Sequence, residues 1–242
     1  MKRTFHHLIV SRLILIVAIF LTFAACSGQS EETSEGQEGA SSGDNYSNMQ
    51  PESADNDSIV QVIATYNPTE NRHLFEISND EIFSGWTTFR FSNASPSDHF
   101  FLIFKAPEEA IAAADAANEP LLDHWYNSVT APFQEEYNPY VIGDIEYGEF
   151  VDNLVASIIE KGPWFFDPGA PAMGGPGFTS AGKTSETTVN LTTGQYIVEC
   201  YVKDENEIFH SYIGMLEHLT VTDEESEKSE PQDEYYAEYF IN

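Results

Sequence analysis

Gly194-Gln195-Tyr196-Ile197-Val198-Glu199-Cys200 is the stretch of this 242-residue chain that decides its fold. β-Branched and aromatic residues dominate 195–202, which is typical of a strand, and the preceding Thr193-Gly194 indicates a turn. The quoted stretch ends in a cysteine, Cys200. Nine residues then separate Cys200 from His210, and four more separate His210 from Met215.

Outward from this strand, the chain reads mostly as short β-branched or aromatic runs bounded by Ser, Asn, Pro and Gly. The predicted strands are 58–66, 73–77, 86–91, 99–104, 187–191, 195–202 and 216–221. Short strands at this spacing predict a mainly β fold, a β-sandwich, in one domain over 58–222.

The segment 106–183 interrupts this pattern and predicts a partly helical insertion. Pro107 followed by acids and an alanine-rich run to Ala117 indicates one helix. Apolar residues at helical spacing from Tyr147 through Glu160 indicate a second, with Tyr-, Asn- and Pro-rich chain between the two. The insertion could be a lid, a partner surface or a decoration of the fold.

The two ends of the chain predict segments outside the domain. Residues 1–25 combine basic residues, a short apolar stretch and Ala24-Ala25 before Cys26, which resembles the signal and lipobox of bacterial lipoproteins. This resemblance implies lipidation of Cys26 and attachment to a membrane of the cell envelope, periplasmic or surface-facing. An ordinary cleaved signal or an uncleaved anchor is the alternative. Residues 26–57 predict a flexible tether, and 223–242 an acidic tail.

The charge balance is strongly acidic, with 40 Asp and Glu against 10 Lys and Arg and a formal net charge of −30. Nucleic acid and anionic membrane surfaces are therefore poor partners for the domain. The acidic surface suits either a saline habitat or electrostatic steering toward a cationic partner.

Cys200 would be the single free thiol of an exported protein if Cys26 carries lipid. A hairpin turning at 203–207 would place Cys200 and His210 opposite each other, with Cβ atoms ~5 Å apart. Gly214 would let the chain return Met215 to the same end, and His99 is the candidate for a second imidazole. Thiolate, two imidazoles and a thioether form the ligand set of a blue-copper site.

Each of these residues also has a structural interpretation. Cys200 could be an inert buried thiol, Met215 core filler, and His99 and His210 hydrogen-bonded histidines. The remaining histidines of the domain, His73, His124 and His218, lie outside the pattern and are interpreted as surface residues.

The chain resembles the cupredoxins, the superfamily of plastocyanin and azurin. The residues that carry the resemblance are Gly85-Trp86-Thr87-Thr88-Phe89, Asn93, His99, Leu191-Thr192-Thr193-Gly194-Gln195-Tyr196, Cys200, His210 and Met215. The resemblance covers 58–105 and 184–222. It implies a Greek-key sandwich and one type-1-like copper held by His99, Cys200, His210 and Met215.

The resemblance also implies a function, which is single-electron transfer by a monomer rather than an enzymatic reaction. A cationic redox protein such as a c-type cytochrome would be the partner. The chain departs from the family in its Cys-to-His spacing, because two to four residues are usual there and nine are present here. The alternatives are a metal-free binding module of the same fold, and copper sequestration or delivery.

Overall fold

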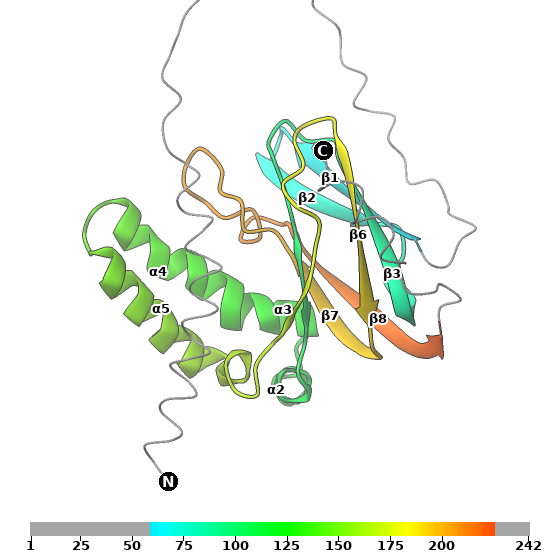
Figure 1. Ribbon diagram of the computed structural model, residues 1–242. Coiled ribbons are helices and arrows are strands. Elements are labelled where there is room, and N and C mark those ends of the chain that lie inside the picture. Colours follow the sequence, from blue (N-terminus) through cyan, green and yellow to red (C-terminus); the bar gives the residue numbers. More distant parts are fainter. Residues whose placement is uncertain (1–58, 226–242) are drawn as a thin grey trace, which may run out of the picture. The chain divides into compact units, whose positions relative to one another are not determined.

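The computed structural model describes residues 59–225 (Figure 1). The predicted signal 1–25, the lipidation site Cys26, the tether 26–57 and nearly all of the tail 223–242 lie outside these residues. The first three residues of that predicted tail belong instead to the last strand, because β8 (Leu216–Glu225) continues past the predicted end at 221.

Two sheets share the long strand β3 (Glu81–Asn93). Its beginning, Glu81–Ser84, pairs in parallel with β8, and its remainder pairs in parallel with β1 (Ile59–Asn67) and antiparallel with β6 (Thr184–Leu191). Gly85, with φ 113°, lies where β3 passes from one sheet to the other. The strand can therefore serve both layers of the sandwich.

The first sheet has the order β2-β1-β3-β6, and the second has the order β3-β8-β7-β4-β5. The strands not yet given bounds are β2 (Arg72–Ile77), β4 (Leu102–Lys105), β5 (Ala172–Gly174) and β7 (Gly194–Glu199). β7 is antiparallel to both β8 and β4 and lies inside its sheet. This position explains the nearly continuous apolar run that ends at Cys200.

Side chains from both sheets meet in one core. Phe101 packs edge-on against Phe75, Phe89 and Phe91, with ring centroids 5.3–6.0 Å apart. Cys200 and Met215 belong to the same buried cluster. The predicted mainly β fold with a partly helical insertion is confirmed.

Within the described residues, the helices lie in the insertion between β4 and β6, and Figure 1 shows α3, α4 and α5 grouped to one side of the strands. The predicted helices are present as α2 (Glu108–Ala117) and α5 (Tyr147–Lys161). The structure adds others in and after the intervening chain: α3 (Leu121–Trp125), the π-helical turn η2 (Tyr126–Thr130), α4 (Ala131–Val141) and the 3-10 turn η3 (Pro163–Phe165). Pro132 is tolerated because it lies in the first turn of α4.

Glu199, the last residue of β7, joins the insertion to the sandwich. Its carboxylate is completely buried and accepts hydrogen bonds from Trp125 Nε1 at 3.2 Å and Thr130 Oγ1 at 2.8 Å, both in the insertion. Tyr201 OH donates a third bond at 2.8 Å. Burial raises the pKa of Glu199, and these hydrogen bonds oppose that shift.

Within residues 59–225, no helix is both long enough and apolar enough to cross a membrane.

Replacing Glu199 by leucine should lower the free energy of unfolding by about 3 kcal/mol, because the buried donors of Trp125, Thr130 and Tyr201 would lose their acceptor. Urea unfolding of the full chain measures this. Glu186→Leu is the control: Glu186 forms an exposed ion pair with Arg90, and its loss should cost less than about 1 kcal/mol. Equal stability of the two variants would show that Glu199 is not the anchor.

Candidate metal centre

His99, Cys200 and His210 converge in the interior at one end of the sandwich. Each of these three side chains is 0% exposed. Nδ1 of His99 lies 3.0 Å from Nδ1 of His210 and 3.9 Å from Sγ of Cys200. Residues from three distant parts of the chain thus present two nitrogens and a sulfur to one point.

The loop between β3 and β4 orients His99. The prediction that His99 is the first residue of a strand is wrong. His99 lies before β4 and pairs with Thr179 in an isolated bridge, with N–H···O distances of 3.1 and 2.7 Å. Oγ of Ser95 forms a short hydrogen bond with Nε2 of His99. With Nε2 occupied in this way, Nδ1 is left facing Cys200 and His210.

Asn93 organises the same loop from inside. It is fully buried, and its Nδ2 donates to the backbone oxygens of Ser97 and Thr179, each at 2.7 Å. Its Oδ1 accepts from the backbone N–H of Ser95 at 3.0 Å. The Asn93 amide therefore holds Ser95 in place, and Ser95 in turn holds the His99 ring.

The hairpin between Cys200 and His210 differs from its predicted register. His210 N–H donates to Val202 O at 2.8 Å, and Ser211 N–H donates to Cys200 O at 3.1 Å. His210 therefore stands opposite Val202 and not opposite Cys200. The nine intervening residues shift the pairing by two positions, which leaves Cys200 and His210 on the same face because side chains alternate along a strand.

Helix α4 braces this long hairpin. Tyr137 OH donates to the Glu207 carboxylate at 2.9 Å and receives a bond from Lys203 Nζ, which also pairs with Glu207. Gln134 Oε1 accepts from the backbone N–H of Phe209 at 2.7 Å. The long loop and the helical insertion therefore support each other next to the site.

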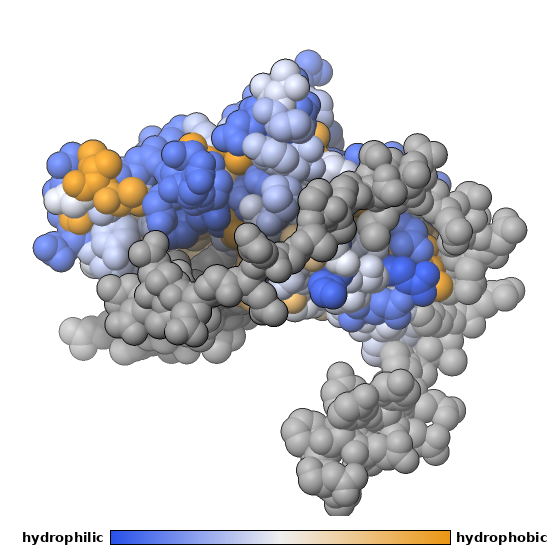
Figure 2. All heavy atoms as spheres, turned by 90° about the horizontal axis from the view of Figure 1, so that it is seen from above, coloured by the Kyte–Doolittle hydropathy of each residue, from blue (hydrophilic) through white to orange (hydrophobic). Residues whose placement is uncertain are grey.

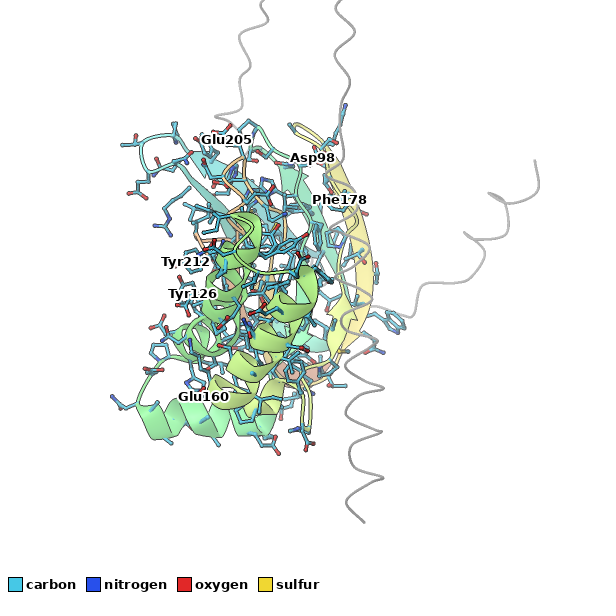
Figure 3. The ribbon with its side chains drawn as sticks, turned by 90° about the vertical axis from the view of Figure 1, so that its left-hand side faces the viewer. Asp98, Tyr126, Glu160, Phe178, Glu205 and Tyr212 are labelled. Atoms are coloured by element: carbon cyan, nitrogen blue, oxygen red, sulfur yellow. The ribbon has the colours of Figure 1, made fainter. Side chains whose placement is uncertain are left out.

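The loop from His210 to Met215 closes the site. Met215 is fully buried, its N–H donates to His210 O at 2.9 Å, and its carbonyl accepts from Cys200 N–H at 3.1 Å. Figure 3 shows Tyr212 of this loop beside Tyr126 of η2, and their rings stack with centroids 5.8 Å apart. All the sequence-predicted site residues of the domain, His99, Cys200, His210 and Met215, thus lie near one another.

Burial keeps these groups uncharged. It lowers the pKa of His99 to about 2 and that of His210 to about 3, and neighbouring imidazoles act in the same direction. It raises the pKa of the Cys200 thiol to about 12. Neutral imidazoles keep a free lone pair for a metal, whereas the thiol would lose its proton on binding one.

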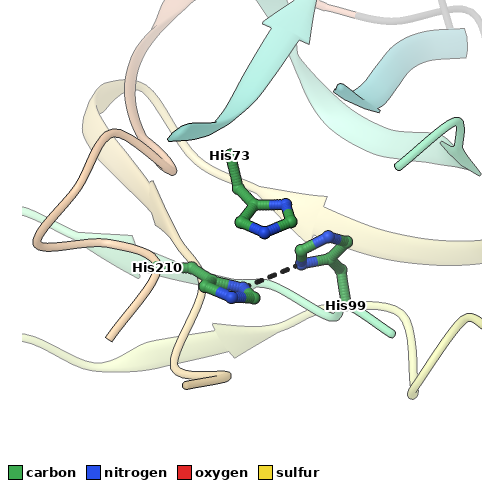
Figure 4. A group of neighbouring side chains, drawn as sticks. All are labelled: His73, His99 and His210. Carbon is green, nitrogen blue, oxygen red and sulfur yellow. Dashed lines mark hydrogen bonds between the residues drawn. The ribbon is translucent and has the colours of Figure 1, made fainter. Parts of the chain in front are cut away.

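His73 is the residue that sequence analysis placed wrongly. It is 5% exposed, not a surface residue, and its ring stacks on His210 with centroids 4.2 Å apart (Figure 4). His124 and His218 are half-buried and do not belong to the group of histidines. The available sign of an inward-facing His73 was its two-residue spacing from Phe75, since both are buried on one face of β2.

Comparisons with known proteins find similar solved structures. Auracyanin A, described as a "blue" copper protein from Chloroflexus aurantiacus, is 17% identical over 68% of this chain and 98% of its own, with a TM-score of 0.34. Auracyanin from Roseiflexus castenholzii is 15% identical over 68% and 97%, with a TM-score of 0.34. Rusticyanin from Thiobacillus ferrooxidans is 18% identical over 68% and 78%, with a TM-score of 0.33.

These similar structures are cupredoxins, the group that the sequence resembles. No protein-family model matches the chain, and no curated protein matches it significantly. The case for a metal rests on the geometry of the buried donors and not on these similarities.

Gly214 should not tolerate a side chain. Its φ is 132°, and a Cβ there would lie 2.8 Å from Leu74 Cδ2 and 3.1 Å from the backbone oxygen of His73. Gly214→Ala should therefore lower the free energy of unfolding by about 1–3 kcal/mol.

The matched control is Gly148→Ala in α5, where a Cβ meets nothing within 4 Å. Alanine is favoured over glycine inside a helix, so this variant should gain up to about 1 kcal/mol. Changes of the same sign in both variants, measured by urea unfolding, would contradict the tight approach of β2 to the loop.

Proposed function

We propose that this chain is a copper-binding electron-transfer protein of cupredoxin type. The single observation that carries the proposal is the position of His99 Nδ1, 3.0 Å from His210 Nδ1 and 3.9 Å from Cys200 Sγ in a fully buried space. Two imidazoles, one thiol and a nearby thioether form the donor set that copper takes in blue-copper sites.

The residues present fit such an ion. Nδ1 of His99 and Nδ1 of His210 face each other at 3.0 Å. Imidazoles buried only for structural reasons could equally have formed hydrogen bonds with backbone groups or with water. Among residues 59–225, Nε2 of His210 is buried without a hydrogen-bond partner. No hydrogen bond from this nitrogen therefore explains the orientation of the His210 ring. Zinc also accepts cysteine and histidine, but a buried thioether beside the thiolate favours the softer copper ion.

A copper ion held there would supply a one-electron couple between Cu(II) and Cu(I). The protein's own contribution is rigidity. Ser95 fixes His99, backbone hydrogen bonds join Cys200 to Met215, and α4 braces the hairpin that carries His210. Donors that cannot move between the two oxidation states keep the reorganisation small, and burial excludes water from the site.

The location and the partner belong to the same proposal. Lipidation of Cys26 would tether the domain to a bacterial cell envelope, and a cationic redox protein such as a c-type cytochrome would meet its acidic surface. The net charge of −30 supports a cationic partner. Figure 2 agrees with a polar encounter surface, since the coloured residues that it shows are mostly hydrophilic, with hydrophobic residues in small separate patches.

Titration of the full chain with Cu(II) tests the proposal. We expect about one copper per chain and an intense visible band from charge transfer between thiolate and copper. Cys200→Ser should abolish the band, because the hydroxyl is not a soft donor, while the fold keeps a side chain of similar size.

His218→Phe is the control for this experiment, since His218 lies in β8 and bonds to Gln195 away from the site. It should keep the full band. A colourless wild-type protein, or a band that survives in Cys200→Ser, would refute the proposed copper centre.

A further inference from the structure

A third buried imidazole faces the site, and the proposed function leaves it unused. His73 lies on β2, in the sheet opposite to the one that contains β7, and only 5% of it is exposed. Its ring centroid is 4.2 Å from that of His210 and 4.9 Å from that of His99. No other imidazole of residues 59–225 joins this group.

The nitrogens of the three rings are close enough to share an ion. One ligand nitrogen from each of His73, His99 and His210 lies within 4.8 Å of the other two. Figure 4 shows a ring nitrogen of His73 facing the gap between His99 and His210. Two nitrogens bound to one ion are at most about 4.2 Å apart, twice a bond of about 2.1 Å, so only a small contraction separates this group from a coordination sphere.

Contacts of β2 hold His73 in this position. Arg72 Nε, in the preceding residue, donates to the backbone oxygen of Ile213 at 2.8 Å. The backbone oxygen of His73 itself lies so close to Gly214 that a Cβ there would be 3.1 Å away. β2 is thus bound to the loop that carries His210 and Met215, which fixes the backbone of His73 relative to that loop.

The hydrogen bonding of His73 does not explain its burial. Its Nδ1 is buried and has no hydrogen-bond partner among the described side chains and backbone groups. A buried ring nitrogen without a partner loses the free energy of hydration that it had in water. Coordination of a metal through the other ring nitrogen would compensate for part of that loss.

We propose that His73 is a third imidazole ligand of the ion bound by His99, His210 and Cys200. This inference rests on the proposed function, and it assigns the site one nitrogen donor more than the cupredoxin pattern of the sequence implied. Imidazole donors suit Cu(II) well, so a third one would stabilise the oxidised ion and lower the reduction potential of the site.

Pulsed electron paramagnetic resonance of the full chain loaded with Cu(II) tests the assignment, because it counts the imidazoles coupled to the ion. The proteins compared are wild type, His73→Phe and His124→Phe. Phenylalanine keeps a flat ring against His210, and His124, whose Nδ1 lies 3.3 Å from Glu119 Oε2 in the insertion, is the matched control. We expect three imidazoles in the wild type and in His124→Phe, and two in His73→Phe.

Copper affinity provides a readout that does not depend on the spectrum. Competition with a chelator should show at least about a tenfold weaker binding of Cu(II) by His73→Phe, and no change in His124→Phe. If His73→Phe does not fold, the count in the wild-type protein decides alone, since within residues 59–225 only His73 lies close enough to supply a third imidazole to this site.

The outcomes separate the two proposals. Two imidazoles in every protein, together with a band that depends on Cys200, would overturn the role of His73 and leave the copper centre in place. His73 would then merely stack on His210. Three imidazoles without any Cys200-dependent band would support His73 and overturn the thiolate. A wild type that takes up no copper would overturn both.

Discussion

The position of His99 Nδ1 between Cys200 Sγ and His210 Nδ1 is the constraint on which the rest of the site depends. Three polar groups from separate parts of the chain are fully buried together, which is unfavourable unless something binds them. The surroundings hold this arrangement from every side. Ser95 fixes His99 through Nε2, the Cys200 backbone is paired with Met215, and His210 stands on a hairpin braced by α4.

The insertion is part of this arrangement and not a decoration of it. Its Trp125 and Thr130 donate to Glu199, the residue before Cys200, and its Gln134 and Tyr137 bind the hairpin that leads to His210. A nine-residue connection between thiol and imidazole would otherwise be a long exposed ribbon. The helices therefore support the long loop. The donors still converge although the spacing from cysteine to histidine is longer than is usual in cupredoxins.

Local pattern was sufficient to predict most strands, the helices α2 and α5, and Cys200 with its partners, because apolar runs and turn residues record local burial. It was insufficient wherever the answer lay in pairing between distant segments. His73 was read as a surface residue, since nothing next to it in sequence reveals that β2 packs on the loop of Gly214. The two-residue shift of His210 against Cys200 likewise depends on how the hairpin docks on α4. α4 itself was missed because Pro132 and Pro139 mask a helix that tolerates both.

X-ray absorption at the copper edge of the Cu(II)-loaded chain identifies the atoms bound to the ion, and so decides whether Cys200 is a ligand. We expect one short copper–sulfur distance together with the scattering of at least two imidazole rings. A first shell of nitrogen and oxygen alone, with no sulfur, would contradict this expectation and return Cys200 to the role of an inert thiol in the core.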